Sequence, residues 1–130
     1  MPDAVRLTNP RRLPETVRIL RRLGIRFSTE GFLTIAPSAI PPSSHFPGKV
    51  GRSRSIPPLL VPNSTTPART LTLLKKLGAN AAGPFFAAGK AGQINAALFA
   101  AACLATRDPK LRRALDRFRS HQTSSVPLRP

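Results

Sequence analysis

Three observations predict an α/β fold for this chain of 130 residues. Residues 13–27 read as an amphipathic helix, a glycine and the start of an extended segment. Residues 56–62, IPPLLVP, suit one short buried strand, because proline is tolerated at the first position of a strand. Residues 84–105 read as a weak strand, a small-residue turn and a long apolar helix.

The first helix is predicted over residues 13–23, LPETVRILRRL. Its apolar residues recur at spacings near three and four, and its arginines occupy the other face. Gly24 supplies a stop for this helix, and the following IRF begins an extended segment.

Proline dominates the N-terminal half of the chain. Eleven of the 15 prolines fall within the first 67 residues, which argues against long regular elements there. Apart from the strand at 56–62, residues 28–67 are therefore predicted to be loop-rich or poorly ordered.

Three helices are predicted in the remainder of the chain. The first covers residues 68–77 and is closed by Gly78, and the second covers residues 94–105. Asp108 is a good N-cap for the third, which has Pro109 at its first position. An apolar stripe runs along one face of the third helix and is formed by Leu111, Ala114, Leu115 and Phe118.

Several protein classes are excluded or left unsupported by composition. The apolar helical segment from Gln93 to Ala105 has 13 residues, whereas a membrane span needs about 20. Cys103 is the single cysteine, so an internal disulfide is excluded. The N-terminus has no apolar core of the kind that signal peptides carry.

The net charge of +16 is the strongest compositional signal, with 21 Lys and Arg against five acidic residues. Such a charge favours nucleic acid, an anionic surface or phosphorylated ligands as partners. A high positive charge can also arise without any functional cause, since Arg- and Pro-rich chains arise from GC-rich genomes and from misread reading frames. No basic motif interleaved with aromatic residues supports nucleic-acid binding.

Two sites could carry chemistry. The turn at Gly89–Gly92 opens a helix and could present backbone N–H groups to an anion, although its spacing from Gly83 does not match a P-loop. His45 stands in a Pro/Gly loop, and its imidazole could act as an acid or a base. A plain turn and a plain loop residue are the alternatives. No metal-ligand cluster and no catalytic triad can be assembled from this sequence.

The segment AAGKAGQINAALFAAACLATRDPKLRRALDRFRSHQTSSV, from Ala88 to Val126, resembles the C-terminal end of the PurE family, the class I carboxyaminoimidazole ribonucleotide mutases. In that family a strand leads into G-K-A-G-x-x-N-A-A-L-x-A-A and then an Asp-led corner and a helix. HFPGKVGRSRSIPPLLVP, from His45 to Pro62, is similar to the family's H-L-P-G block and the strand after it. LPETVRILRRLGIRF is similar to its first helix.

Other parts of the chain depart from the family pattern. The family's phosphate-binding loop, G-S-x-S-D, is replaced by TNPRR, Thr8 to Arg12, without the Ser and the Asp. The S-A-H-R motif has only SAIPP, Ser38 to Pro42, in its place, and the helix and strand that follow the motif are missing. The resemblance therefore implies a diverged or truncated member.

The resemblance implies a reduced three-layer αβα, flavodoxin-like parallel sheet as a single domain over residues 1–126, with a tail at 127–130. It implies a cytoplasmic enzyme of purine biosynthesis that needs no cofactor and moves a carboxylate on an imidazole ribonucleotide substrate. His45 would be the catalytic residue, and Gly48, Gly89, Lys90 and Gly92 would bind substrate. The C-terminal helix would dock on a partner chain through its Leu111, Leu115 and Phe118 stripe, as in the family's octamer.

Loss of the phosphate anchors predicts impaired catalysis. Two alternatives remain open: a non-catalytic basic protein that oligomerises and binds polyanions, and the product of a frameshifted gene or pseudogene.

Overall fold

A computed structural model describes residues 3–38, 58–62, 66–80 and 84–127 of the chain. The described elements are strands β1 (Asp3–Leu7), β2 (Phe27–Ser28), β3 (Gly31–Ser38) and β4 (Leu59–Pro62), the short 3-10 helix η1 (Pro10–Arg12), and helices α1 (Pro14–Arg22), α2 (Pro67–Asn80), α3 (Lys90–Ala105) and α4 (Pro109–Ser124). None of the described helices is long and apolar enough to cross a membrane.

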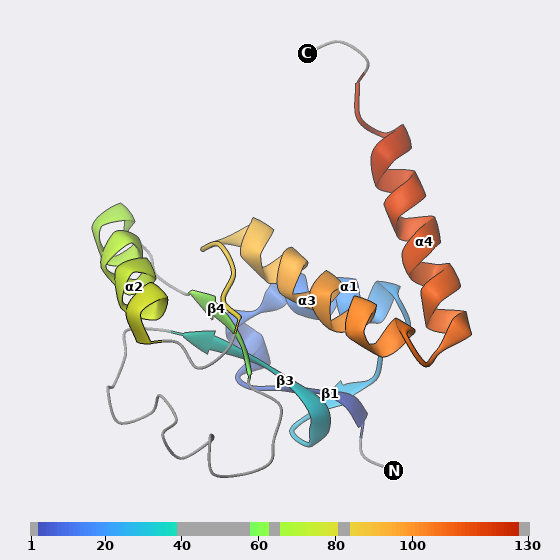
Figure 1. The fold of residues 1–130 in the computed structure, drawn as a ribbon, viewed down its shortest axis with the longest axis horizontal. Coiled ribbons are helices and arrows are strands. Elements are labelled where there is room, and N and C mark those ends of the chain that lie inside the picture. Colours follow the sequence, from blue (N-terminus) through green and yellow to red (C-terminus); the bar gives the residue numbers. More distant parts are fainter. Residues whose placement is uncertain (1–2, 39–57, 63–65, 81–83, 128–130) are drawn as a thin grey trace.

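The four strands form one parallel sheet in the order β2-β1-β3-β4 (Figure 1). Phe85 adds a parallel bridge to Leu60 beyond β4, in the place of a fifth strand. The order with this addition is that of a flavodoxin-like sheet, so the predicted α/β class and parallel sheet are confirmed.

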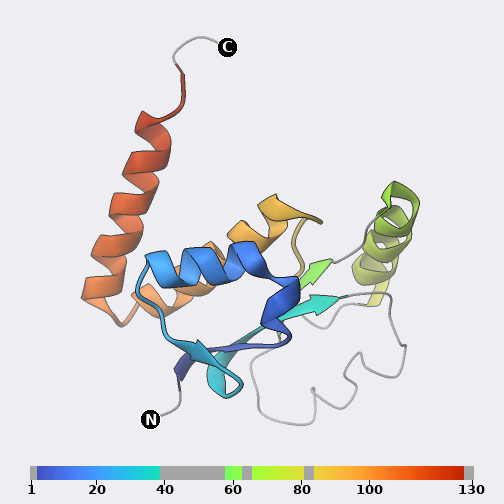
Figure 2. The same ribbon diagram turned by 180° about the vertical axis from the view of Figure 1, so that it is seen from behind.

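Helices lie on both faces of the sheet. α1 and α3 cover one face side by side (Figures 1 and 2). The core beneath them is formed by strand residues Val5, Leu7, Leu33, Ile35, Leu59 and Val61, together with apolar residues of the two helices. On the opposite face, Leu73 of α2 packs with Leu60 and Ala36. These two clusters make the three layers of the predicted αβα arrangement, with a thin second helical layer.

The central strand β3 was not predicted, because Pro37 and the flanking prolines made residues 28–55 read as loop. The side chains of β3 instead alternate between the two faces of the sheet, as in a strand. Leu33 and Ile35 are buried on one face, and Phe32 is exposed on the other. Pro37 lies next to its last residue, near the edge of the paired region. Strand pairing on both sides outweighs the local proline signal here.

β2 and β3 lie on opposite sides of β1, yet only Thr29 and Glu30 separate them in the chain. Parallel strands are usually joined by a crossover of a dozen or more residues, most often a helix. This two-residue link precedes Ser38, whereas the comparison with the PurE pattern placed the missing helix and strand after Ser38–Pro42.

α1 ends as its sequence predicts. Gly24 donates its N–H to the Arg21 carbonyl at 3.1 Å, and Ile25 donates to the Leu20 carbonyl at 2.9 Å. These two bonds form a Schellman motif, and its usual apolar contact is available because Leu20 and Ile25 are both buried. By contrast, Gly78 does not end α2, which runs on to Asn80.

α4 begins at the predicted cap. Asp108 Oδ1 accepts hydrogen bonds from the N–H groups of Lys110 and Leu111, both at 3.1 Å. Leu111, Leu115 and Phe118 are buried in the same core as α1 and α3. The prediction that this stripe docks on a partner is therefore wrong, because the chain's own core covers it.

Candidate functional site at the carboxyl edge of the sheet

The strand order places a candidate site at the carboxyl ends of β1 and β3. In open parallel sheets ligands bind outside these ends, at the point where the chain connections reverse direction. β1 lies between β2 and β3, so the reversal falls there. Two described segments lie at this edge: residues 8–13, which lead from β1 into α1, and residues 86–92, which lead into α3.

The first segment carries two exposed cations. Thr8 donates its N–H to the Ile35 carbonyl at 3.0 Å, which ties the start of this loop to β3. Asn9 adopts a left-handed conformation with φ of 51°, and η1 follows directly. Arg11 and Arg12 are exposed one turn before α1. The TNPRR segment therefore brings two guanidinium groups to the N-terminus of a helix.

The second segment is a tight turn whose glycines are required by its geometry. Gly89 is the N-cap of α3 and has φ of 83°, which disfavours any residue with a side chain. Gly92 is buried in the first turn of α3, and a Cβ there would overlap the carbonyl of Ala87. Lys90 is exposed at the first helical position. The turn geometry accounts for both glycines without a ligand, and the predicted substrate contacts of Gly89, Lys90 and Gly92 stay predictions.

Gln93 joins the two segments. Its side-chain Oε1 accepts a hydrogen bond from the N–H of Glu15 at 3.0 Å, which caps α1 in place of its own N-cap residue. Its main-chain carbonyl accepts a hydrogen bond from the Thr16 hydroxyl at 2.7 Å, and Thr16 is fully buried. The N-termini of α1 and α3 are thus held side by side at one edge of the sheet.

No pattern in the sequence assigned a role to the side chain of Gln93 or Thr16. Both residues lie in the first turn of a helix, where a polar side chain is ordinary. Their partner is 77 or 78 residues away in the chain, so no local pattern could reveal the pair.

The arrangement favours an anionic ligand. Two helix N-termini present the positive ends of their dipoles to the same edge, and Arg11, Arg12 and Lys90 add full charges. The carboxylate of Glu15 is engaged by Arg18, with the Arg18 Nε 2.8 Å from its Oε2. Among the described residues no group of three His, Cys, Asp or Glu could hold a metal ion.

His45 and Gly48, the other predicted site residues, lie outside the described residues. His121 is exposed near the end of α4, on a helix that projects away from the sheet (Figure 1). In the part of the chain that is described, the carboxyl edge therefore offers groups that bind an anion and no imidazole.

Comparison with known proteins identifies relatives over much of the chain. The chain is 36% identical over 104 residues to an N5-carboxyaminoimidazole ribonucleotide mutase of Brucella melitensis biotype 1, covering 78% of this chain and 64% of the relative. It is 32% identical over 87 residues to the mutase of the same name from Pseudomonas aeruginosa, covering 65% of this chain and 53% of the relative. The chain thus spans between about half and two thirds of the length of these two relatives. No protein-family model matches it.

Proposed function

Because this chain is a diverged member of the PurE family, we propose that it acts in purine biosynthesis as a carboxyaminoimidazole ribonucleotide mutase of reduced activity. The observation that carries this proposal is the pairing of two helix N-termini by Gln93 at the switch point of a parallel sheet. The phosphate of an imidazole ribonucleotide would bind there, and the cytoplasm, where nucleotides are made, would be the site of action.

The reaction is a balanced transfer within one substrate. The bond between the exocyclic nitrogen and the carboxylate carbon breaks, CO₂ is released, and the nitrogen gains a proton. The imidazole ring carbon then bonds to CO₂ and loses its proton, so nothing is oxidised or reduced. One proton is gained and one is lost, which suits a single acid–base group, and we propose His45 for this role from its match to the family's H-L-P-G block.

We propose reduced activity because of the replaced phosphate loop. A Ser–Asp pair offers hydroxyl and carboxylate groups at short reach, whereas Arg11 and Arg12 are long cationic side chains exposed at the same place. Guanidinium groups attract phosphate strongly, but they do not reproduce the hydrogen-bond geometry of the lost pair. Ribonucleotide binding is therefore expected to persist while positioning, and with it turnover, is reduced.

The test is conversion of carboxyaminoimidazole ribonucleotide by the purified chain, beside its His45→Ala and His121→Ala variants. We expect slow conversion that falls about 10²-fold or more in His45→Ala, since acid–base catalysis contributes on that order. His121→Ala removes the same side chain from the exposed end of α4 and should retain full activity. Equal activity of all three proteins would contradict the role of His45, and no conversion by any of them would contradict the mutase activity.

Ligand binding can be measured separately from turnover. The mutase product should raise the melting temperature of the chain, because a ligand that binds only the folded state stabilises it. Arg11→Gln combined with Arg12→Gln should reduce that rise. An unchanged melting temperature at saturating product would contradict ribonucleotide binding at the carboxyl edge.

We also propose that the chain forms homo-oligomers through the far end of α4. With the apolar stripe buried, the part available for a partner is residues 119–126, which are all exposed and include the 66% exposed Val126. This end of the helix projects from the body of the molecule (Figures 1 and 2). A chain ending at residue 118 should sediment as a smaller species than the full chain, and identical sedimentation would contradict this proposal.

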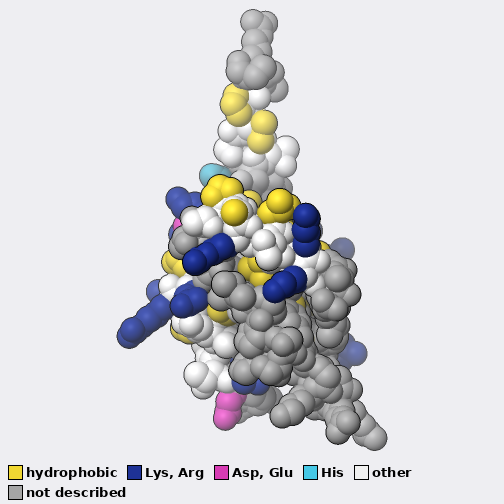
Figure 3. Space-filling view, turned by 90° about the vertical axis from the view of Figure 1, so that its left-hand side faces the viewer, with side chains coloured by type: hydrophobic (Ala, Val, Ile, Leu, Met, Phe, Trp, Pro, Cys, Tyr) yellow, Lys and Arg dark blue, Asp and Glu magenta, His cyan; other side chains and the backbone are white. Residues whose placement is uncertain are grey.

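A second candidate function, polyanion binding without catalysis, is favoured by the charge of +16. On the face seen in Figure 3, Lys and Arg side chains far outnumber acidic ones. Binding of this kind falls steeply with salt concentration, because bound cations are released from the nucleic acid. Affinity for a random oligonucleotide that changes little between 50 and 200 mM salt would exclude it.

A further inference from the structure

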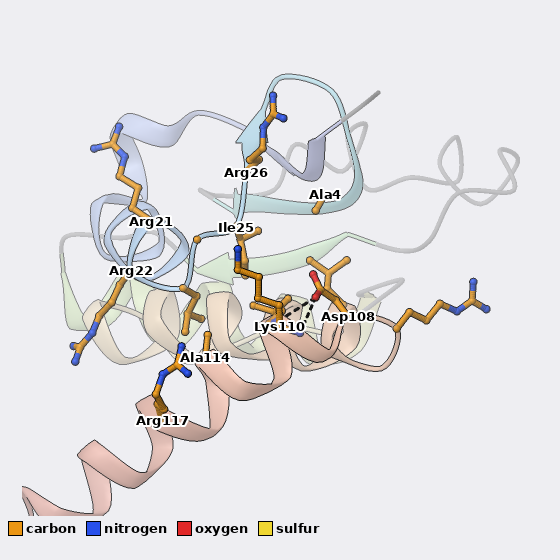
Figure 4. Close-up of a pocket in the computed structure, with 14 residues that line it drawn as sticks. Ala4, Arg21, Arg22, Ile25, Arg26, Asp108, Lys110, Ala114 and Arg117 are labelled. Carbon is orange, nitrogen blue, oxygen red and sulfur yellow. Dashed lines mark hydrogen bonds between the residues drawn. The ribbon is translucent and has the colours of Figure 1, made fainter.

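A groove lies at the opposite end of the sheet from the candidate site. It runs between α4 and the turn that joins α1 to β2, with Ala4 at the start of β1 and the α3–α4 corner closing its ends (Figure 4). Its volume is about 700 Å³, within the range of sites that hold small molecules. None of the predicted site residues that the structure describes, Gly89, Lys90 and Gly92, lines it.

The groove is strongly cationic. Six basic residues line it, contributed by α1, the turn before β2, the α3–α4 corner and α4: Arg21, Arg22, Arg26, Arg107, Lys110 and Arg117. Among the described lining residues Asp108 is the one acid, and its carboxylate already accepts hydrogen bonds from two backbone N–H groups at the start of α4. The lining therefore carries five more positive than negative charges, and a groove with low-dielectric walls concentrates such a field.

The basic side chains play different parts. Lys110 and Arg117 reach from α4 towards the turn that carries Ile25, whereas Arg21 and Arg26 point outwards at the rim (Figure 4). Arg22 lies over the ring of Phe118, with its guanidinium carbon 4.9 Å from the ring centroid. This contact holds one cation against α4 without an acidic partner.

Between the cations the groove has an apolar floor. Ile25 and Leu111 are buried there, and Leu104 and Ala114 are partly buried. A wholly polar anion would leave this floor without a partner, while a wholly apolar molecule would leave the cations without one. The lining therefore matches a molecule that has phosphate groups at one end and a flat or apolar body at the other.

We propose that this groove is a second binding site, for a nucleotide that carries two or more phosphate groups. The phosphates contact Lys110 and Arg117, whose cationic groups suit phosphate oxygens. The base or sugar covers the floor formed by Ile25, Leu111 and Ala114. The site is independent of mutase activity, because it lies at the amino ends of the strands and shares no residue with the carboxyl edge.

The test uses ADP as the probe, titrated into the full-length chain by calorimetry at 0.15 M salt, where weak contacts with surface charge are screened. The groove variant is Lys110→Gln with Arg117→Gln. The matched control is Arg112→Gln with Arg113→Gln, which removes two exposed cations from the same helix outside the groove. All four residues are exposed, so both variants should fold, and thermal unfolding verifies this.

We expect one ADP per chain, with affinity at least tenfold weaker in the groove variant and changed less than twofold in the control. Equal loss in both variants would show attraction to net charge alone and would overturn the proposal. So would ADP binding that survives in the groove variant and is lost in Arg11→Gln with Arg12→Gln, because the ligand would then occupy the carboxyl edge.

Two further probes test the ligand class. Inorganic pyrophosphate should bind more weakly than ADP, and equal affinity would overturn the role of the apolar floor. A single-stranded oligonucleotide should bind the groove variant and the control alike. If its binding, and not that of ADP, depended on Lys110 and Arg117, the groove would be a nucleic-acid surface and the nucleotide proposal would be wrong.

Discussion

The two ends of the sheet attract anions by different physical means. At the carboxyl edge the backbone contributes to the positive potential, through the N-termini of α1 and α3 that Gln93 holds together, beside the charges of Arg11, Arg12 and Lys90. At the amino edge it comes from side chains, because Asp108 already caps α4 and the Arg and Lys residues supply the charge. Both sites depend on the fold, but the groove draws its charge from several exposed side chains and would tolerate loss of any one of them without unfolding.

The largest expected effect is at Gly92. In Gly92→Ala the new Cβ overlaps the Ala87 carbonyl, and the backbone must shift to relieve it. We expect a loss of about 3 kcal/mol in the free energy of unfolding, at the upper end for overpacking. Urea denaturation measures it, with the exposed Asn95→Ala in the same helix as the control. A loss under about 1 kcal/mol would show that the turn is looser than its geometry implies.

The next effect is at Thr16, which tests the link between the two helices. Thr16→Val keeps the shape of the side chain but leaves the Gln93 carbonyl without its buried donor. We expect a loss of about 1–2 kcal/mol in the free energy of unfolding. Thr106→Val removes an exposed hydroxyl, which donates to the Cys103 carbonyl, and should cost less than about 0.5 kcal/mol. Equal costs for the two variants would contradict the importance of the link.

Substitutions at Asp108 distinguish its contribution to the stability of the fold from its effect on the charge of the groove. Asp108→Ala removes the cap and should cost about 1 kcal/mol of stability, while Asp108→Asn keeps a side-chain acceptor and should cost only a few tenths. Both variants remove the one acidic residue of the groove lining, so both should bind ADP about two- to fivefold more tightly. Weaker ADP binding in Asp108→Asn would contradict an electrostatic role for the groove.

The smallest effect is expected at the exposed pair of Glu15 and Arg18. Arg18 has a side-chain exposure of 53%, so Arg18→Ala should change the free energy of unfolding by less than about 0.5 kcal/mol. It releases the Glu15 carboxylate at the N-terminus of α1, which should weaken ribonucleotide binding slightly. Thermal shifts with the mutase product measure this, and a larger thermal shift would contradict an anion site at this edge.

Local patterns predicted the helices well and the sheet poorly. The Gly24 stop and the Asp108 cap are each visible within six residues of sequence, and both form as predicted. β3 was missed because its proline signal is local, whereas its pairing with β1 and β4 is not. The stripe on α4 was read correctly as apolar, but a periodic pattern cannot say whose core it enters, and it enters that of its own chain.

For the site, sequence resemblance led to the turn at Gly89–Gly92 and to the family, and the known relatives support the family. The turn shows why two glycines stand there: one because of its positive φ and the other because of close backbone approach. Sequence resemblance could reveal neither the bridging role of Gln93 nor the basic groove. Each joins residues distant in the chain, and the groove exists only because α4 packs beside the turn after α1.

Periodicity, capping residues and family motifs in the chain were enough to establish an α/β protein related to the PurE mutases, since these signals act over a few residues or over aligned segments. Tertiary packing was needed to establish which helix N-termini meet, which face of α4 is buried and where the cations gather. These features depend on contacts between segments far apart in the chain, and a linear pattern does not contain the distances that decide them.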